Sequence, residues 1–476
     1  MVNRNNALRG QMTCSTSALA IALLLAVVVT PTRNAHAQGT PSSGGPSAAP
    51  GDTSLTFHGI TLYGTVDIGL QYATHSAPIS DSYINGTLAF VRPNSNNSVF
   101  GATPSNLSQS KIGLQGIEPL VGDWSAVFRL ETFFNPQSGE ISNALKSLTN
   151  NNGRPLADQD SGADSSVAGQ TFQASYIGLA SPTFGSLTFG RQPTLLHDGV
   201  AKYDPQIYSL AFSLLGAQGI TAGGGDTEDR RLNSSLRYSE HIGAAHFGAE
   251  YKFNGATGSA STAAQFEVGY EYANASIDAY YSEVKDAISM ASLSAAQVTA
   301  LPPLGFSSNN SLAGTVSDNK AYAIMALYTF GAPSVYAGYE YIRFANPATP
   351  LSAGFDDIGG YKLAFVNNTA YDNDKNLQVF WAGLRYTATP KLTLAVAYYG
   401  YKQNSYATGA HTDCSSDVNG GCSGSETVLT LSADYRFSKR FDTYVGTMYS
   451  HVQNGLASGY LHTSNIATTI GMRFLF

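Results

Sequence analysis

Hydrophobic and polar residues alternate along most of the chain from residue 55 onwards. The stretch LYGTVDIGLQY shows the pattern clearly, with Leu62, Val66, Ile68, Leu70 and Tyr72 on one face and Tyr63, Thr65, Asp67 and Gln71 on the other. A period of two residues is that of a β-strand whose two faces meet different surroundings. The same alternation recurs at irregular intervals down to the last residue, which predicts an all-β protein.

Sixteen segments follow this alternation. They predict strands at 55–72, 107–117, 124–134, 171–181, 186–194, 231–241, 245–254, 264–274, 275–286, 319–330, 334–344, 377–388, 391–403, 426–437, 441–453 and 464–476.

The connections between these segments alternate between long and short. The long ones include 73–106, 135–170, 195–230 and 345–376, and the short ones include PTFG, GAPS and TP. Tight turns at one end and long loops at the other are typical of an outer-membrane β-barrel. A sheet in hydrocarbon must close, because it cannot leave backbone groups unpaired. The pattern therefore predicts a 16-stranded antiparallel transmembrane β-barrel over 55–476, although alternation alone would also allow a soluble sandwich or propeller.

The first 54 residues have a different character. Arg4 and Arg9 precede an apolar run of about 12 residues, ALAIALLLAVVV, and a small-x-small pattern at 35–37. These three parts predict a secretory signal peptide at 1–37, cleaved before Gln38, because the run is too short to span a bilayer comfortably. Residues 38–54 are rich in Pro, Gly and Ser, which predicts a flexible extension.

Composition agrees with an exported β-protein. Only 12% of the residues are charged, while 28 are Tyr and 48 are Gly. Without the leader's three bases, 23 Lys and Arg face 33 Asp and Glu, a formal charge of −10. This acidic balance argues against a nucleic-acid partner. No motif of a hydrolase, phosphate loop, metal centre or cofactor site is found, so we expect neither enzymatic activity nor a cofactor.

Two cysteines remain after the leader is removed. Cys414 and Cys422 stand in HTDCSSDVNGGCSG among turn-forming residues. In an oxidising compartment this pattern favours a local disulfide. The alternative is a metal site, for which only His411 is a nearby third ligand.

Several segments together resemble a known family. LYGTVDIGLQY, SKIGLQG, SYIGLASPTFGSLTFGRQ, NSSLRYSE and the terminal Phe are similar, in that order, to the general porins of Gram-negative bacteria, above all those of neisserial and Burkholderia-type species. The resemblance covers about residues 55 to 476. It implies a homotrimer with a water-filled pore in each subunit, short periplasmic turns and long extracellular loops, and a third long loop that folds into the pore and narrows it.

A pore selects by the charges at its narrowest point. The inward loop should be 195–230, where Asp198 and Asp204 are candidate acids and PQIYSLAFSLL is a candidate short helix. Strand parity turns four bases toward the lumen: Lys111, Arg129, Arg231 and Arg237. The resemblance places Lys111 and Arg231 where general porins have constriction bases. A basic wall facing an acidic loop would create a transverse field.

Two further residues have predicted roles outside the pore. Arg191 has the parity of Leu187 and Phe189, so it should point outward and form a salt bridge to a neighbouring subunit. Closure pairs the last strand with the first and places Phe476 in the periplasmic aromatic girdle. The resemblance implies that the outer-membrane assembly machinery reads this terminal Phe.

The functional prediction is passive transport. We expect an outer-membrane diffusion channel for ions and small hydrophilic solutes, surrounded by outer-membrane lipid and lipopolysaccharide. The alternative is an adhesin or receptor barrel that binds partners through its long extracellular loops. Ionic preference and preferred solutes do not follow from the sequence.

Overall fold

The computed structural model describes residues 55–78, 80–82, 89–141, 144–160, 171–218, 231–253, 262–356 and 358–476. All of them belong to the unit Pro41–Phe476. The predicted leader and extension lie outside the described residues, as does the acidic end of the 195–230 loop. Among the described residues no helix is long and apolar enough to cross a membrane.

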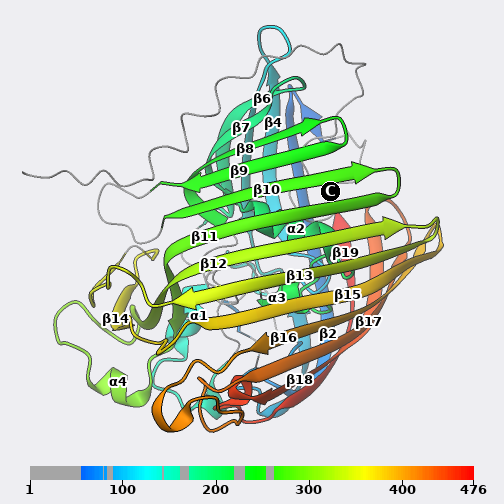
Figure 1. Cartoon of the computed structure of the whole chain (residues 1–476). Helices are drawn as coiled ribbons and strands as arrows, with labels where there is room; N and C mark the ends of the chain where they lie inside the picture. The colour runs from blue at the N-terminus through cyan, green and yellow to red at the C-terminus, as the bar shows by residue number, and fades with distance from the viewer. Residues whose placement is uncertain are drawn as a thin grey trace, which may run out of the picture. The chain divides into compact units, whose positions relative to one another are not determined.

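Sixteen strands pair in sequence to form a closed antiparallel barrel (Figure 1), so the predicted fold class is confirmed. Each predicted strand has a counterpart. The barrel strands are β2 (Ile60–Ser76), β4 (Lys111–Pro119), β5 (Ser125–Phe133), β6 (Ala174–Ser181), β7 (Gly185–Pro193), β8 (Arg231–Ile242), β9 (Ala245–Lys252), β10 (Ala263–Tyr272), β11 (Ala275–Ala291), β12 (Ser311–Thr329), β13 (Pro333–Ala345), β15 (Lys375–Thr389), β16 (Leu392–Gln403), β17 (Gly424–Arg436), β18 (Phe441–Asn454) and β19 (Ser464–Leu475).

The other described elements lie at the strand ends or in the long connections. They are the strands β1 (Thr56–Phe57), β3 (Asn97–Pro104) and β14 (Lys362–Asn367), the helices α1 (Ala144–Asn150), α2 (Leu195–Tyr203), α3 (Leu214–Gln218) and α4 (Ala295–Thr299), and the 3-10 turns η2 (Leu156–Asp158), η5 (Gly409–His411) and η6 (Gly455–Ala457).

The last strand closes the barrel against the first. β19 pairs antiparallel with β2 from Ala467 opposite Ala73 to Leu475 opposite Thr65. Phe476 continues the ladder, because its backbone exchanges both hydrogen bonds with Gly64, at 2.8 and 3.1 Å. The Phe476 ring occupies the space where a Cβ on residue 64 would stand. A glycine at position 64 therefore accommodates the terminal aromatic ring.

Alternation sorts the strand side chains between two surroundings. On β19, Ile470, Met472 and Phe474 point outward and are 57%, 52% and 45% exposed. On β2, Asp67 and Gln71 are buried on the inner side. An apolar outer surface with polar residues inside is what a barrel in a bilayer requires.

The pairing between the first two barrel strands, β2 and β4, is interrupted, which was not predicted. The first part of β2, from Ile60 to Thr65, pairs with β4. The rest, from Ile68 to Ser76, pairs with β3, which lies in the segment 73–106 that was expected to be a long loop. Ser105, just after β3, has a φ of +58°. The buried Asp67 carboxylate then accepts hydrogen bonds from the backbone N–H groups of Leu107 and Ser108, at 2.9 and 2.8 Å. These bonds hold the chain out of the sheet, so β4 begins at Lys111 and not at residue 107.

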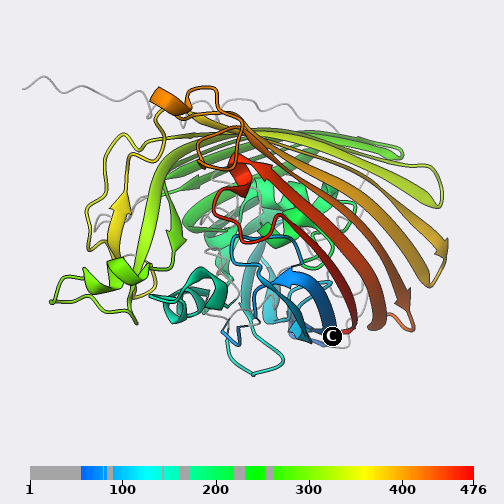
Figure 2. The ribbon, with the colours of Figure 1, turned by 90° about the horizontal axis from the view of Figure 1, so that it is seen from below.

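The third long connection folds inside the barrel, where α2 and α3 lie within the curve of the sheet (Figure 2). We call residues 195–217 the strap. Its start is tied to the inner wall by hydrogen bonds from the N–H of Leu195 to Glu250 at 3.2 Å and from the N–H of Leu196 to Gln265 at 3.1 Å. Its second half is bound to the segment between β3 and β4, where the N–H of Ala211 donates to the carbonyl of Asn106 at 2.9 Å.

The helix expected at 205–215 is wrong in position. The strap is helical before it, in α2, which Thr194 caps by accepting from the N–H of His197. Pro205 cannot donate a backbone hydrogen bond, and Ile207 and Tyr208 have φ values of +52° and +55°. The chain turns here, and a second helix starts only at Leu214.

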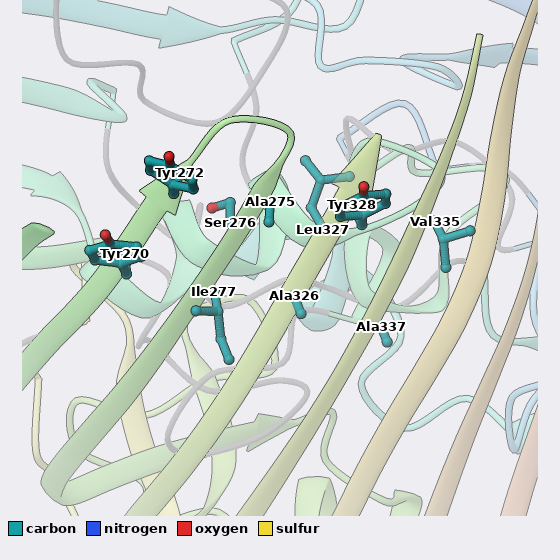
Figure 3. Close-up of a pocket in the computed structure, with 10 residues that line it drawn as sticks. All are labelled: Tyr270, Tyr272, Ala275, Ser276, Ile277, Ala326, Leu327, Tyr328, Val335 and Ala337. Atoms are coloured by element: carbon teal, nitrogen blue, oxygen red, sulfur yellow. The ribbon is translucent and has the colours of Figure 1, made fainter. Parts of the chain in front are cut away.

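The outer surface carries an apolar groove of about 480 Å³ near the tight turns of β10 to β13 (Figure 3). Its floor is made of small side chains, including Ala275, Ala326 and Ala337, and tyrosine rings border it. Tyr270, Tyr272 and Tyr328 are about half exposed or more. Exposed tyrosines around an apolar surface near the strand ends are typical of an interfacial aromatic girdle.

Candidate functional site

A cluster of charged side chains lies on the inner wall at β2, β4 and β5. Lys111 Nζ lies 3.2 Å from Glu131 Oε2, and Arg129 Nη2 lies 2.6 Å from the same oxygen. The Tyr63 hydroxyl donates to Glu131 at 2.9 Å and accepts from Arg129 Nε at 2.7 Å. The alternation predicted that Lys111 and Arg129 face inward, and Glu131, two residues after Arg129 on β5, faces the same side.

Arg231 extends this cluster from β8. Its guanidinium carbon lies 4.9 Å from the centre of the Phe133 ring. Phe133 is opposite Lys111 in the β4–β5 register, so Arg231 lies close to Lys111. A cation over an aromatic face is attracted by the ring quadrupole. We call Lys111, Arg129, Glu131 and Arg231 the basic cluster; it contains three cations and one carboxylate.

The remaining predicted base, Arg237, is bound to the strap. Its Nη1 lies 2.7 Å from Asp198 Oδ2 and also donates to the carbonyl of Pro193 at 2.9 Å. Burial alone would raise the pKa of Asp198, but the Arg237 guanidinium and His197 outweigh it and lower the pKa to about 2. Each charge of this pair is therefore balanced by the other, and the pair fixes α2 against the wall.

Asp204 does not reach the pore water in this structure, because it has no exposed surface. Its carboxylate accepts hydrogen bonds from the Tyr399 hydroxyl at 2.6 Å and from the N–H of Tyr208 at 2.7 Å. Burial raises its pKa, against the opposing effect of these bonds. Asp204 thus anchors the turn after α2.

The acidic residues nearest the strap come from the barrel wall. Lys202 of α2 contacts two of them, with its Nζ 3.2 Å from Asp278 Oδ2 on β11 and 2.5 Å from Glu271 Oε1 on β10, while Glu267 on β10 lies 3.6 Å from His246 Nε2. This region of the wall and strap holds three carboxylates, one lysine and one histidine. Strand parity could have found them, because Glu267 stands between Phe266 and Val268, which point outward. The candidate pore acids expected from the sequence were Asp198 and Asp204, both in the loop.

Arg191 lies on the outer side of the barrel, next to a register shift between β7 and β8. It bonds within its own chain, to Asn233 Oδ1 at 2.5 Å and to the carbonyl of Phe172 at 3.0 Å. The salt bridge to a neighbouring subunit stays a prediction.

Cys414 and Cys422 are joined by a disulfide within the β16–β17 loop. Because the two sulfur atoms are bonded to each other, neither is a thiolate that could ligate a metal with His411.

Comparison with known proteins identifies the fold and the family. A family model described as Gram-negative porin matches residues 20–455. The solved structures that resemble the chain include an anion-selective porin from Comamonas acidovorans, with 17% identity and a TM-score of 0.54, covering 88% of this chain and 99% of that one. A loop-deletion mutant of OmpT from Vibrio cholerae, at 14% identity, has the same TM-score and the same coverage of both chains.

A trimer form of OmpT from Vibrio cholerae also matches, with 13% identity and a TM-score of 0.50, covering 88% of this chain and 99% of that one. At such identities these likenesses are of fold. A search of the curated proteins returns no match.

Proposed function

We propose, from the premise that this chain belongs to the Gram-negative porin family, that its outer-membrane diffusion channel admits small hydrophilic solutes with a preference for anions. The observation that carries the preference is the sharing of one carboxylate, Glu131, by two cations, Lys111 and Arg129, with Arg231 beside them. Asp198, an acid that would offset this charge from the strap, is already paired with Arg237.

Burial supports a role for these charges in the pore. The side chains of Lys111 and Arg129 are 18% and 11% exposed on the inner wall, so each is accessible and only partly screened by water. Charges at a constriction with low-dielectric walls act more strongly on passing ions than charges in open water. A solute then passes from the outer loops across the basic cluster and leaves by diffusion, with no catalytic step and no cofactor.

The oligomeric state and membrane surroundings of this channel are proposed from the family to which it belongs. We propose a homotrimer, a state in which the fold relative OmpT is also found, embedded in outer-membrane lipid and lipopolysaccharide and exported by the signal peptide. We further propose that the assembly machinery reads Phe476. Its support is the position of this residue, which pairs with Gly64 at the closing seam.

The test is single-channel recording of the purified protein in a planar bilayer under a salt gradient. The proposal predicts conductance steps in groups of three and a zero-current potential with the sign of a more permeant anion. A potential with the cation sign would contradict the anion preference, and the absence of conductance from a folded, heat-modifiable barrel would contradict the open channel.

A further inference from the structure

We propose that the inner wall at β9, β10 and β11 carries a binding site for a divalent zinc ion, with His246, Glu267 and Asp278 as ligands. His246 and Asp278 both lie opposite Gly269 in the strand register, one on each neighbouring strand. A Cβ on residue 269 would collide with His246 Nε2 and Asp278 Oδ1. The glycine therefore lets the two side chains meet above the middle strand.

The donor atoms have the spacing of a metal site. His246 Nε2 lies 3.0 Å from Asp278 Oδ1 and 3.6 Å from Glu267 Oε1, and the three donor atoms lie within 4.8 Å of one another. Zinc bonds of about 2.0–2.2 Å in tetrahedral geometry separate neighbouring ligand atoms by about 3.3 Å. The observed separations lie on either side of this value, so small rotations of the side chains would complete three corners of a tetrahedron.

The surrounding groups orient these ligands. The Tyr280 hydroxyl lies 3.0 Å from Glu267 Oε1 and 3.1 Å from Asp278 Oδ2. Lys202 contacts the same Asp278 oxygen, Oδ2. The other oxygen of this carboxylate, Asp278 Oδ1, is buried and faces His246 Nε2 at 3.0 Å. For Asp278, outer groups thus hold one carboxylate oxygen and leave the other for the ion, an arrangement typical of metal sites.

Charge and ligand type favour zinc over the hard cations. Glu271 and Asp278 share the ammonium of Lys202, and Glu267 brings a third carboxylate next to Asp278, so a divalent ion reduces the repulsion between these carboxylates. A neutral imidazole nitrogen suits Zn²⁺, whereas Mg²⁺ and Ca²⁺ prefer oxygen ligands. The competing account is an ion pair between protonated His246 and Asp278 with no metal. That account predicts no binding.

The experiment is isothermal titration of Zn²⁺ into the detergent-solubilised, EDTA-stripped protein at neutral pH. We expect about one ion per chain in the wild type and binding at least about tenfold weaker in His246→Ala, because an imidazole ligand is lost. His451→Ala is the matched control; this β18 histidine is hydrogen-bonded to the Thr463 carbonyl, and its loss should leave the binding unchanged.

A second variant distinguishes loss of a metal ligand from loss of the folded structure. Glu267→Gln preserves the shape of the side chain and should also weaken binding about tenfold, with the heat-modifiable barrel band showing that the protein is folded. Saturable one-to-one binding that His246→Ala and Glu267→Gln both weaken supports the site. Equal binding by wild type and both variants, or no binding by wild type, would overturn it. Because binding is measured without a bilayer, the result does not depend on the channel's ion preference.

Discussion

Two regions of the inner wall have the same construction and opposite charge. In the basic cluster, the Tyr63 hydroxyl bonds to Glu131 among Lys111 and Arg129. At β10 and β11, the Tyr280 hydroxyl bonds to Glu267 and Asp278 beside Lys202. In both regions a buried tyrosine orients carboxylates among cations, but one has an excess of bases and the other an excess of acids.

The difference suggests a new origin for the field that the sequence analysis expected across the lumen. The sequence suggested a basic wall against an acidic loop, yet both acids of the described strap are bound, Asp198 by Arg237 and Asp204 by Tyr399. We propose instead that acids of the barrel wall, together with the basic cluster, create the field. The strap itself is bound to Arg237 at one point and to Asp278 and Glu271 of the acidic region at another.

Removal of the shared carboxylate should have the largest effect. Glu131→Gln leaves Lys111 and Arg129 partly buried without a counter-charge, which should cost about 3 kcal/mol of stability. It should also increase the anion preference. The measurement is the temperature at which the folded, heat-modifiable band disappears, together with the zero-current potential.

Glu140→Gln is the control for that variant. Glu140 pairs with Lys146, and both side chains are 48% exposed, so its loss should change stability by less than about 1 kcal/mol. Equal melting temperatures for the two variants would contradict the central place of Glu131 in the basic cluster.

Acid should release the strap only at very low pH. Asp198 has a pKa of about 2 in the folded protein, below the ordinary value of 3.8. Its pairing with Arg237 therefore stabilises the strap fully above about pH 4, and this contribution is lost as the pH falls toward about 2. We expect no increase in the current noise of the open channel from neutral pH down to about pH 4, and a changed, noisier level below it.

Asp198→Asn sharpens this prediction. The variant lacks the charge that Arg237 binds, so it should show the noisy level already at neutral pH. Single-channel recordings over the pH range decide the question. The same pH profile in wild type and variant would show that the pair does not hold the strap.

The smallest effect is expected outside the pore. Arg191→Ala removes exposed hydrogen bonds to Asn233 and Phe172, each worth little to one chain. If Arg191 bridges subunits, the variant should lower the temperature at which trimers dissociate and leave the melting of the barrel unchanged. Gel mobility after stepwise heating measures both, and unchanged trimer dissociation would remove Arg191 from the interface.

Local pattern explains what could be predicted. Each of the sixteen barrel strands was found because its alternation is visible within about ten residues, as in the segments that became β2 and β19, and parity correctly turned Lys111 and Arg129 inward. β3 was missed because it depends on the remote Asp67, which binds the backbone after Ser105. The strap helix was misplaced because Pro205 and two residues of positive φ prevent a helix that the apolar run suggested.

Contacts between distant residues explain what could not be predicted. His246 and Asp278 meet only because both lie opposite Gly269 across three strands. Sequence spacing does not reveal such a row without the register. Likewise, Asp204 seemed a pore acid by its loop position, and only the fold brings Tyr399 to its carboxylate.

The most direct test compares zero-current potentials of two double variants in one salt gradient, with EDTA present. Lys111→Gln with Arg231→Gln should lower the anion-to-cation permeability ratio by roughly tenfold, because the basic cluster loses its excess charge. Glu267→Gln with Asp278→Asn should raise the ratio, because the acidic region loses two charges. Opposite shifts are the result that the account predicts. Shifts in the same direction, or no shift in the first variant, would contradict it.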